Sequence, residues 1–330
     1  MASVRVATFN VENLFARFRF RGKPTYRNGK VVGYRPYTRQ QLDSILARGW
    51  TVEETFFMPF KHTARDVTGD AIKATKADIL ALQEVESMDG LKKFNTDVLD
   101  GRYRQKLAID GNDPRRIDVG LLCAPKKAAA GAINIRNIRT HQFLRTANNQ
   151  AFIFSRDCLE VDLQLADGEL TLFINHFKSM MEGKAQTEAR RVLQVQKVID
   201  IIQDRFSKAG PGNANWVLLG DFNTYRPSAA LALLDKLDWA VDVTKRIPDD
   251  ERWTHFYDPT EWNSGGAPEY RQLDYIWMSK ALAAKNPGVP TVIRKGLCLA
   301  AKKYTGPRFK GVTGKVAASD HCPVAMDITI

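Results

Sequence analysis

Long apolar runs, paired cysteines and internal repeats are all missing from this sequence. Its four cysteines are far apart, with no CxxC pair and no zinc-like spacing: Cys123, Cys158, Cys298 and Cys322. We therefore expect free, mostly buried thiols in a reducing compartment, although a Cys298–Cys322 disulfide stays open. No apolar run reaches membrane-spanning length and no signal peptide is evident, so we expect a cytoplasmic protein without a membrane span. A secreted mature form would begin in the same way.

Acidic residues are also in the minority. The 330 residues include 49 lysines and arginines against 37 aspartates and glutamates, a formal charge of +12. Such a field attracts phosphate-rich ligands, so it favours a polyanionic partner such as nucleic acid. A hydrophobic fraction of 44% and a charged fraction of 26% are typical of a globular protein with a substantial core. No protein partner is indicated, and we expect a monomer.

The segment from about residue 16 to residue 65 is basic and aromatic. It contains Arg19 and Arg21, with rings interleaved among its cations and glycines and prolines breaking any regular pattern. We interpret it as a long loop or flap that could grip phosphates and stack on bases. A solvated loop is an equal alternative. A second basic, glycine-punctuated loop at 302–315 contains Lys303.

Apolar periodicity predicts a mixed α/β chain. Helices are expected at 63–76, 88–99, 184–206 and 227–237, the last with a proline in its first turn. Strands are expected at 4–9, 78–85, 117–123, 133–139, 152–154, 159–165, 171–175, 216–220, 253–257, 273–278, 291–293 and 324–328. The helix at 184–206 is predicted to cross over to the strand at 216–220.

Polar side chains stand at the ends of several predicted strands. Carboxylates and amides at a strand end could hold a hydrated divalent cation, or a water, beside a phosphate. Each one alone also fits an ordinary polar turn. Six such ends are hard to attribute to turn chemistry, and sheets collect their strand ends along one rim. We therefore expect one site from Asn10 with Glu12, Glu84, His176, Asp221 with Asn223, Asp274 and His321.

These residues belong to short motifs that together resemble one family. The motifs are Asn10-x-Glu12, Leu82-Gln83-Glu84, Asn175-His176-Phe177-Lys178-Ser179, Gly220-Asp221-Phe222-Asn223, Leu273-Asp274-Tyr275 and Ser319-Asp320-His321. In this order they resemble the endonuclease/exonuclease/phosphatase superfamily, which contains DNase I. The resemblance implies a four-layer αββα sandwich of two packed, mixed, mostly antiparallel sheets flanked by helices. It also implies a single domain over residues 1–330, with the insertion at about 16–65.

The resemblance further implies Mg²⁺-dependent hydrolysis of a phosphoester, with Mn²⁺ as a candidate substitute. Glu84 is the expected principal metal ligand, because a carboxylate suits Mg²⁺. Asn10 would support the metal or the phosphate, and Glu12 and Asp320 would complete or extend the metal site. Glu12 stands where some relatives have Asp, which leaves its direct ligation open.

The catalytic roles also follow from the resemblance. Asp221 and Asn223 would orient the attacking water and a phosphate oxygen. His321, with Asp274 fixing its tautomer, forms a dyad able to act as a base, and the base is either Asp221 or His321. His176 would donate a hydrogen bond or a proton at the scissile phosphate.

Several cations are expected to bind the substrate. Lys178 and, more weakly, Arg116 would lie near the phosphate, and Arg19, Arg21 and Lys303 would follow the nucleic acid. They favour a divalent-metal-dependent nuclease acting on DNA, which leaves 5′-phosphate and 3′-hydroxyl as the resemblance implies. One alternative is a phospholipid or inositol-phosphate phosphoesterase, with the apolar cluster at 56–60 inserting into a membrane. The other is a non-catalytic nucleic-acid-binding module.

Overall fold

A computed structural model of the chain describes residues 3–12, 19–20, 23–28, 30–35, 40, 57–58, 62–113, 115, 117–125, 133–262 and 265–330. Arg21 and Arg116, two of the predicted substrate-binding cations, lie outside these residues. So do residues 56, 59 and 60 of the apolar cluster. Arg19 is described by its backbone alone.

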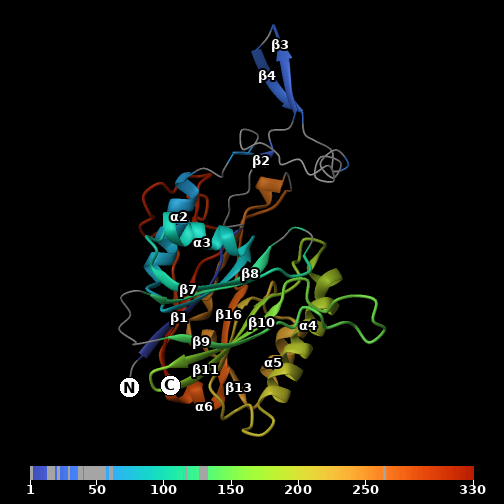
Figure 1. The fold of residues 1–330 in the computed structure, drawn as a ribbon, viewed down its shortest axis with the longest axis vertical. Helices are drawn as coiled ribbons and strands as arrows, with labels where there is room; N and C mark the ends of the chain where they lie inside the picture. The colour runs from blue at the N-terminus through green and yellow to red at the C-terminus, as the bar shows by residue number, and fades with distance from the viewer. Residues whose placement is uncertain are drawn as a thin grey trace.

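Two six-stranded sheets form the centre of the fold (Figure 1). The first has the order β17 (Thr291–Val292), β18 (Val324–Thr329), β1 (Ser3–Asn10), β6 (Ile79–Val85), β8 (Asp118–Pro125) and β7 (Tyr103–Ile109). The second has the order β13 (Ala240–Asp242), β16 (Asp274–Ser279), β12 (Trp216–Asp221), β11 (Gly168–His176), β10 (Cys158–Leu165) and β9 (Asn134–Arg139). Only the pairs β1–β6 and β11–β12 are parallel among those described in these two sheets.

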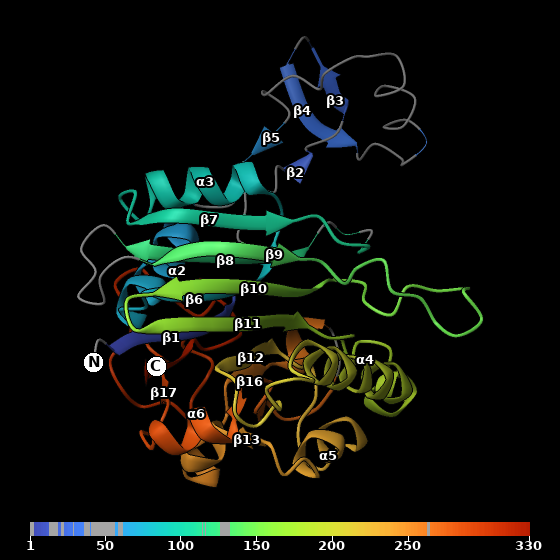
Figure 2. The same ribbon diagram turned by 60° about the horizontal axis from the view of Figure 1, so that its bottom comes forward.

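Helices cover the outer faces of both sheets (Figures 1 and 2). α2 (His62–Thr75) and α3 (Met88–Asp97) share a buried cluster with β1 and β6. α4 (Lys184–Arg205) and α5 (Ala229–Asp235) share another with β11 and β12. A third cluster joins the inner faces of the two sheets and includes α6 (Lys280–Lys285). The expected four-layer αββα sandwich of mixed, mostly antiparallel sheets is therefore confirmed.

The strand β12 shows why the central strands of the two sheets are continuous apolar runs in the sequence. Val217 and Leu219 belong to the cluster between the sheets. Trp216 and Leu218 point the other way and pack under the helices. Successive side chains of a strand face opposite sides, so a strand covered on both faces needs apolar residues at every position. The predicted crossover is also correct, because α4 connects the parallel strands β11 and β12.

The basic insertion contains strands where a loop was expected. β3 (Lys23–Arg27) pairs with β4 (Lys30–Arg35), and β2 (Arg19–Phe20) pairs with β5 (Phe57–Met58). The interpretation of 16–65 as a loop throughout was therefore wrong at these positions. Glycines and prolines concealed the pairing, because Pro24 and Gly33 lie within the two hairpin strands themselves.

Other element predictions need correction. Residues 152–154 form no strand, only an isolated bridge between Arg145 and Phe152. α5 begins at Ala229 after the N-cap Ser228, so Pro227 lies outside its first turn. β7 was missed because its middle residues are polar. Also missed were β13, α6 and β15 (Glu269–Arg271), which pairs with β14 (His255–Tyr257).

The described residues also include three short 3-10 helices, at Val243–Arg246, Asp249–Glu251 and Pro259–Trp262. All four cysteines are buried thiols outside any disulfide, as expected, so Cys298 and Cys322 are not joined. Within the described part of the chain, none of the helices combines the length and the apolar character needed to span a bilayer.

Gly220, the next-to-last residue of β12, is required by its surroundings. Its φ is 139°, and an added Cβ would lie 1.9 Å from the backbone oxygen of Asn175 on the neighbouring strand. A side chain here would push β11 and β12 apart at the point where each ends in a polar residue.

We predict that Gly220→Ala lowers the free energy of unfolding by about 3 kcal/mol or more, because it combines a steric clash with an unfavourable φ. Urea denaturation followed by circular dichroism measures this. Gly265→Ala is the matched control, because an added Cβ there meets nothing within 4 Å. Equal stabilities of the two variants would contradict the prediction.

Candidate active site

Antiparallel pairing brings residues from distant parts of the chain to one rim. β1, β11 and β12 end at Asn10, His176 and Asp221. β16 runs antiparallel to β12, so it begins with Asp274 directly opposite Asp221. His321 precedes β18, which runs antiparallel to β1 and so starts where β1 ends. The starts of two strands therefore lie beside the ends of three others.

Asp221 is the centre of this rim and is only 1% exposed. Its Oδ2 accepts hydrogen bonds at 3.0 Å from Asn10 Nδ2, across the two sheets, and at 3.0 Å from Asn223 Nδ2. Its Oδ1 accepts from the backbone N of Asn223 at 2.7 Å. Burial raises the pKa of the Asp221 carboxyl; His321 lowers it and Asp274 raises it further. A buried carboxyl held by several donors is suited to positioning a small polar ligand.

His321 and Asp274 form the predicted dyad. His321 Nδ1 lies 2.8 Å from Asp274 Oδ2, which also accepts a hydrogen bond from Thr254 Oγ1 at 2.7 Å. The second ring nitrogen, Nε2, lies 3.8 Å from Asp221 Oδ2. Burial lowers the pKa of His321, but Asp274, followed by Asp221 and Asp320, outweighs it and raises the pKa well above the ordinary value. The imidazole is therefore held in one orientation and favours a positive charge.

His176 is buried against an arginine that the sequence analysis did not select. Arg156 Nη2 donates to His176 Nε2 at 2.9 Å and to the backbone oxygen of Phe177 at 3.0 Å, and Arg156 Nη1 lies 3.2 Å from Asp113 Oδ2. Burial, followed by the Arg156 charge, lowers the pKa of His176 well below its ordinary value. An arginine can only donate, so His176 Nε2 is an acceptor here. Its expected role as a donor to the phosphate stays a prediction.

The acidic residues expected to bind metal repel one another in this arrangement. The pKa of Glu84 is raised by burial and then by Asp320. The pKa of Glu12 is raised to about 8 by loss of solvation and then by Asp320, whose backbone N donates to Glu12 Oε2 at 3.0 Å. A divalent cation bound among these oxygens would stabilise the charged form of both glutamates. Glu84 is 17% exposed at its side chain, so the group fits a hard ion that keeps most of its waters.

Two sets of three possible metal donors lie within 4.8 Å of one another in the described part of the chain: His255, Asp320 and His321; and Asp221, Asp274 and His321. In the second set, Asp274 and His321 are already hydrogen-bonded to each other. Glu84 belongs to neither, so an ion at Glu84 would have water as most of its ligands.

Three of the predicted site residues have left-handed backbone. The φ angles are 47° at Glu12, 66° at Glu84 and 48° at Asn223. Non-glycine residues rarely adopt this region, and such conformations gather at ligand sites where side chains must be aimed. The backbone thus turns these three side chains away from the ordinary course of a strand.

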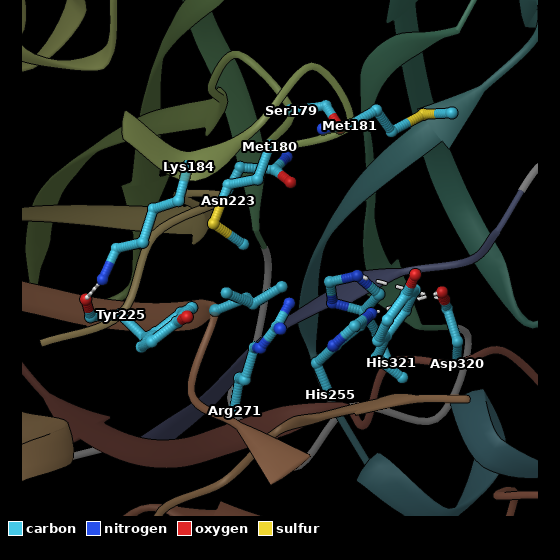
Figure 3. A pocket seen from close by; sticks show the side chains of 12 residues that line it. Ser179, Met180, Met181, Lys184, Asn223, Tyr225, His255, Arg271, Asp320 and His321 are labelled. Atoms are coloured by element: carbon cyan, nitrogen blue, oxygen red, sulfur yellow. Dashed lines mark hydrogen bonds and ion pairs between the residues drawn. The ribbon is translucent and has the colours of Figure 1, made fainter. Parts of the chain in front are cut away.

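A cleft of about 510 Å³ opens onto this rim (Figure 3). Asn223, Asp320 and His321 line it together with cations, rings and methionines: Lys184, Arg271, Tyr225, Tyr257, His255, Met180 and Met181. Lys184 Nζ lies 3.7 Å from the centre of the Tyr225 ring. The guanidinium carbon of Arg271 lies 5.1 Å from the Tyr225 ring and 5.3 Å from the Tyr257 ring. The wall of the cleft is therefore a row of alternating cations and rings.

Two of the predicted substrate-binding cations, Lys178 and Lys303, lie outside the lining of the cleft. Lys178 Nζ pairs with Glu182 Oε1 at 2.6 Å, and Lys178 does not line the cleft. Lys303 lies over the rings of Trp253 and Tyr270, at 5.6 and 5.9 Å, and is also absent from the lining. Their binding roles stay predictions without support from the cleft. The roles of Arg19, Arg21 and Arg116 fall on side chains that the structure does not describe.

Five residues at or near this site were not predicted from the sequence: Arg156, Thr254, His255, Tyr225 and Arg271. Arg156 and Thr254 lie in no motif, and only the fold brings them to His176 and Asp274. Tyr225 and Arg271 gave a weak signal, since each stands within three residues of a motif.

Comparisons with known proteins agree with this arrangement. The model of the endonuclease/exonuclease/phosphatase family matches residues 5–328. The crystal structure of truncated Caenorhabditis elegans TDP2 is similar, with a TM-score of 0.59, 16% identity, and coverage of 99% of this chain and 98% of that chain. The human Nocturnin catalytic domain with bound sulfate anion has a TM-score of 0.58 and 15% identity, covering 99% and 93%. The Danio rerio TDP2 complex with single strand DNA product has a TM-score of 0.54 and 15% identity, covering 100% of each chain. At these identities the likeness shows the fold. A search of curated proteins finds no match.

We predict that Asp274→Asn lowers the pKa of His321, because the mutation removes the principal charge that stabilises the imidazolium. An NMR titration of the His321 ring measures this shift. Asp327→Asn removes an exposed carboxylate paired with Arg5 and serves as the control. An unchanged His321 pKa in Asp274→Asn would contradict the assigned electrostatics.

Proposed function

Because the chain belongs to the endonuclease/exonuclease/phosphatase family, we propose that it is a divalent-metal-dependent phosphodiesterase that cuts nucleic acid, with DNA as the favoured substrate. Members of this superfamily are generally metal-dependent hydrolases of phosphoester bonds. We propose 5′-phosphate and 3′-hydroxyl as the products. The family match over residues 5–328 supports one domain that carries the insertion at about 16–65.

One observation supports nucleic acid above other phosphoesters: the reactive rim opens into a cleft whose wall alternates cations with rings. Cations can contact a phosphate backbone while rings stack on bases, and every base has a face to stack. Arg271 also pairs with Glu269 on the same strand, which holds its guanidinium between Tyr225 and Tyr257. The Danio rerio TDP2 structure holds a single strand DNA product, so this fold can accommodate a polynucleotide.

The proposed roles follow from the contacts of each residue. Glu84 and Asn10 would hold Mg²⁺, which neutralises phosphate charge when bound. Asp221, fixed by Asn10 and Asn223, would orient the attacking water. Asn223 lines the cleft and can donate to a phosphate oxygen.

Proton transfer is proposed to involve Asp221 and His321 together. His321 Nε2 is 3.8 Å from Asp221 Oδ2. At this separation the protonation of one group depends on that of the other. Either group can then supply the proton acceptor, with Asp274 stabilising the imidazolium that results. Arg156 would keep His176 neutral and place positive charge beneath the phosphate.

A lipid phosphoester is the second candidate, favoured by Met181, which is 72% exposed beside the cleft. An exposed apolar side chain at a cleft edge can enter a membrane surface. Vesicle flotation at high salt separates the two candidates, because a lipid enzyme stays with the vesicles while an electrostatically attracted nuclease leaves them.

We predict cleavage of nucleic acid in the presence of Mg²⁺ or Mn²⁺, and none with chelator. Plasmid, linear duplex, single strand and RNA should be tested in parallel on gels. Asp221→Asn and His321→Gln are expected to lose at least about 10³-fold in rate and to retain binding, because they remove reacting groups and leave the cleft wall intact.

Asp100→Asn, which alters an exposed pair with Lys73, is the control for these variants. Cleavage by both site variants at the wild-type rate would refute the assigned chemistry. Nucleic acid bound but never cut by the wild-type protein would indicate the non-catalytic binding module instead.

We also predict that Tyr225→Ala raises KM for a single-stranded substrate by about tenfold, since one base–ring stack contributes roughly 1–3 kcal/mol. Tyr225→Phe should keep the wild-type KM. Tyr304→Ala is the matched control: Arg308 lies 4.4 Å from that ring, and Tyr304 does not line the cleft. An equal KM for Tyr225→Ala and the wild type on single strands would exclude stacking at this position.

A further inference from the structure

His255 stands beside the catalytic dyad without any role in the chemistry proposed above. It begins β14 and forms an antiparallel bridge with His321. Backbone hydrogen bonds on both sides of the bridge fix the segment, from Phe256 N to Asp320 O at 2.9 Å and from Cys322 N to Thr254 O at 2.6 Å. This backbone pairing holds the centres of the two imidazole rings 4.6 Å apart.

Asp320 projects toward both rings (Figure 3). His255 Nε2 lies 3.4 Å from Asp320 Oδ2, and His321 Nε2 lies 3.9 Å from Asp320 Oδ1. One donor atom from each residue can be chosen so that all three are within 4.8 Å of one another. Neighbouring donors around a tetrahedral Zn²⁺, with bonds of about 2.1 Å, are roughly 3.4 Å apart. Small rotations of the side chains would place all three donors on one ion.

The donor types suit a borderline-soft metal rather than Mg²⁺. Two imidazoles and one carboxylate are a common set for Zn²⁺, whereas Mg²⁺ prefers oxygen ligands. His321 Nδ1 already bonds to Asp274, which leaves Nε2 for a metal and gives the carboxylate–histidine–metal arrangement found in many sites. His255 Nδ1 has no hydrogen-bond partner among the described residues, so it can carry the ring proton and leave Nε2 to a metal.

The site is open to an ion from solvent. All three residues line the cleft, and the Asp320 side chain is 42% exposed. Glu84 is not one of the three donors. A metal on His321 Nε2 would occupy the lone pair that the proposed chemistry needs for proton transfer.

We infer that His255, Asp320 and His321 form a second cation site, for Zn²⁺ or a similar transition-metal ion, whose occupancy prevents proton transfer by His321. The binding part of this inference is independent of the proposed function, whereas the inhibition of His321 rests on that function. Zn²⁺ would thus act as an inhibitor that occupies Nε2 of His321, while Mg²⁺ at Glu84 supports activity.

Zn²⁺ binding should be measured by calorimetry on metal-stripped full-length protein in excess Mg²⁺, so that the site at Glu84 is saturated. One tight site is expected in the wild type, with affinity at least about 10-fold lower in His255→Gln. His141→Gln, which alters a histidine paired with Glu160, is the matched control. Glu84→Gln should still bind Zn²⁺. Unchanged binding in His255→Gln, or binding lost in Glu84→Gln alone, would overturn the inference.

Co²⁺ provides a test on the wild-type protein that does not depend on any variant folding. A tetrahedral Co²⁺ bound by histidines absorbs strongly in the visible range, and Zn²⁺ should displace it and remove the absorption. No such spectrum at saturating Co²⁺ would overturn the site. His255→Asn is a second variant should His255→Gln have an altered circular dichroism spectrum.

Inhibition is measured on Mg²⁺-dependent cleavage, with each variant normalised to its own rate without Zn²⁺. Zn²⁺ equal to the concentration of sites should abolish cleavage by the wild type, and His255→Gln should need at least about tenfold more. Equal inhibition of the wild type and His255→Gln by Zn²⁺ would overturn the inhibitory role of the site. Wild-type protein that binds Zn²⁺ but cuts nothing would overturn the proposed function and still support the site.

Discussion

The contact between Asn10 and Asp221 is the one on which the site depends. It joins the end of β1 in one sheet to the end of β12 in the other, at 3.0 Å and with both residues buried. The apolar cluster between the sheets sets their separation, and this bond marks where that cluster gives way to polar chemistry. Asn223 contacts Asp221 directly, and Asp274 and His176 lie opposite it on the two strands paired with β12.

Charge at the rim is balanced by pairing each acid with a specific partner. Asp274 is paired with His321, Asp113 with Arg156, and Asp221 accepts from two amides. Burial, followed by the neighbouring carboxylate of Asp320, raises the pKa values of Glu84 and Glu12. The carboxylate suited to a hydrated cation therefore lies close to the buried groups of the rim, since Glu84 Oε1 is 3.9 Å from His176 Nε2.

The fold class and the members of the rim could be predicted from sequence because each rests on a local pattern. Buried strands such as β12 are apolar at every position, and short motifs mark Asp221, Asp274 and His321. Arg156 and Thr254 could not be found in this way, because they act through contacts made only after folding. β7 was not predicted because its middle residues are polar. The strands of the insertion were not predicted because proline and glycine lie within them. The cations chosen by composition stay predictions, because net charge favours a polyanionic partner but does not indicate which side chains would contact it.

β1 and β18 lie side by side in the middle of a sheet, although they come from opposite ends of the polypeptide. Ser319 Oγ also donates to the backbone oxygen of Asn10 at 2.8 Å, which ties the last motif to the first. The reactive constellation therefore cannot form in a nascent chain until residues 319–329 have been synthesised. A hydrolase with this topology would stay inactive on the ribosome until that segment pairs with β1.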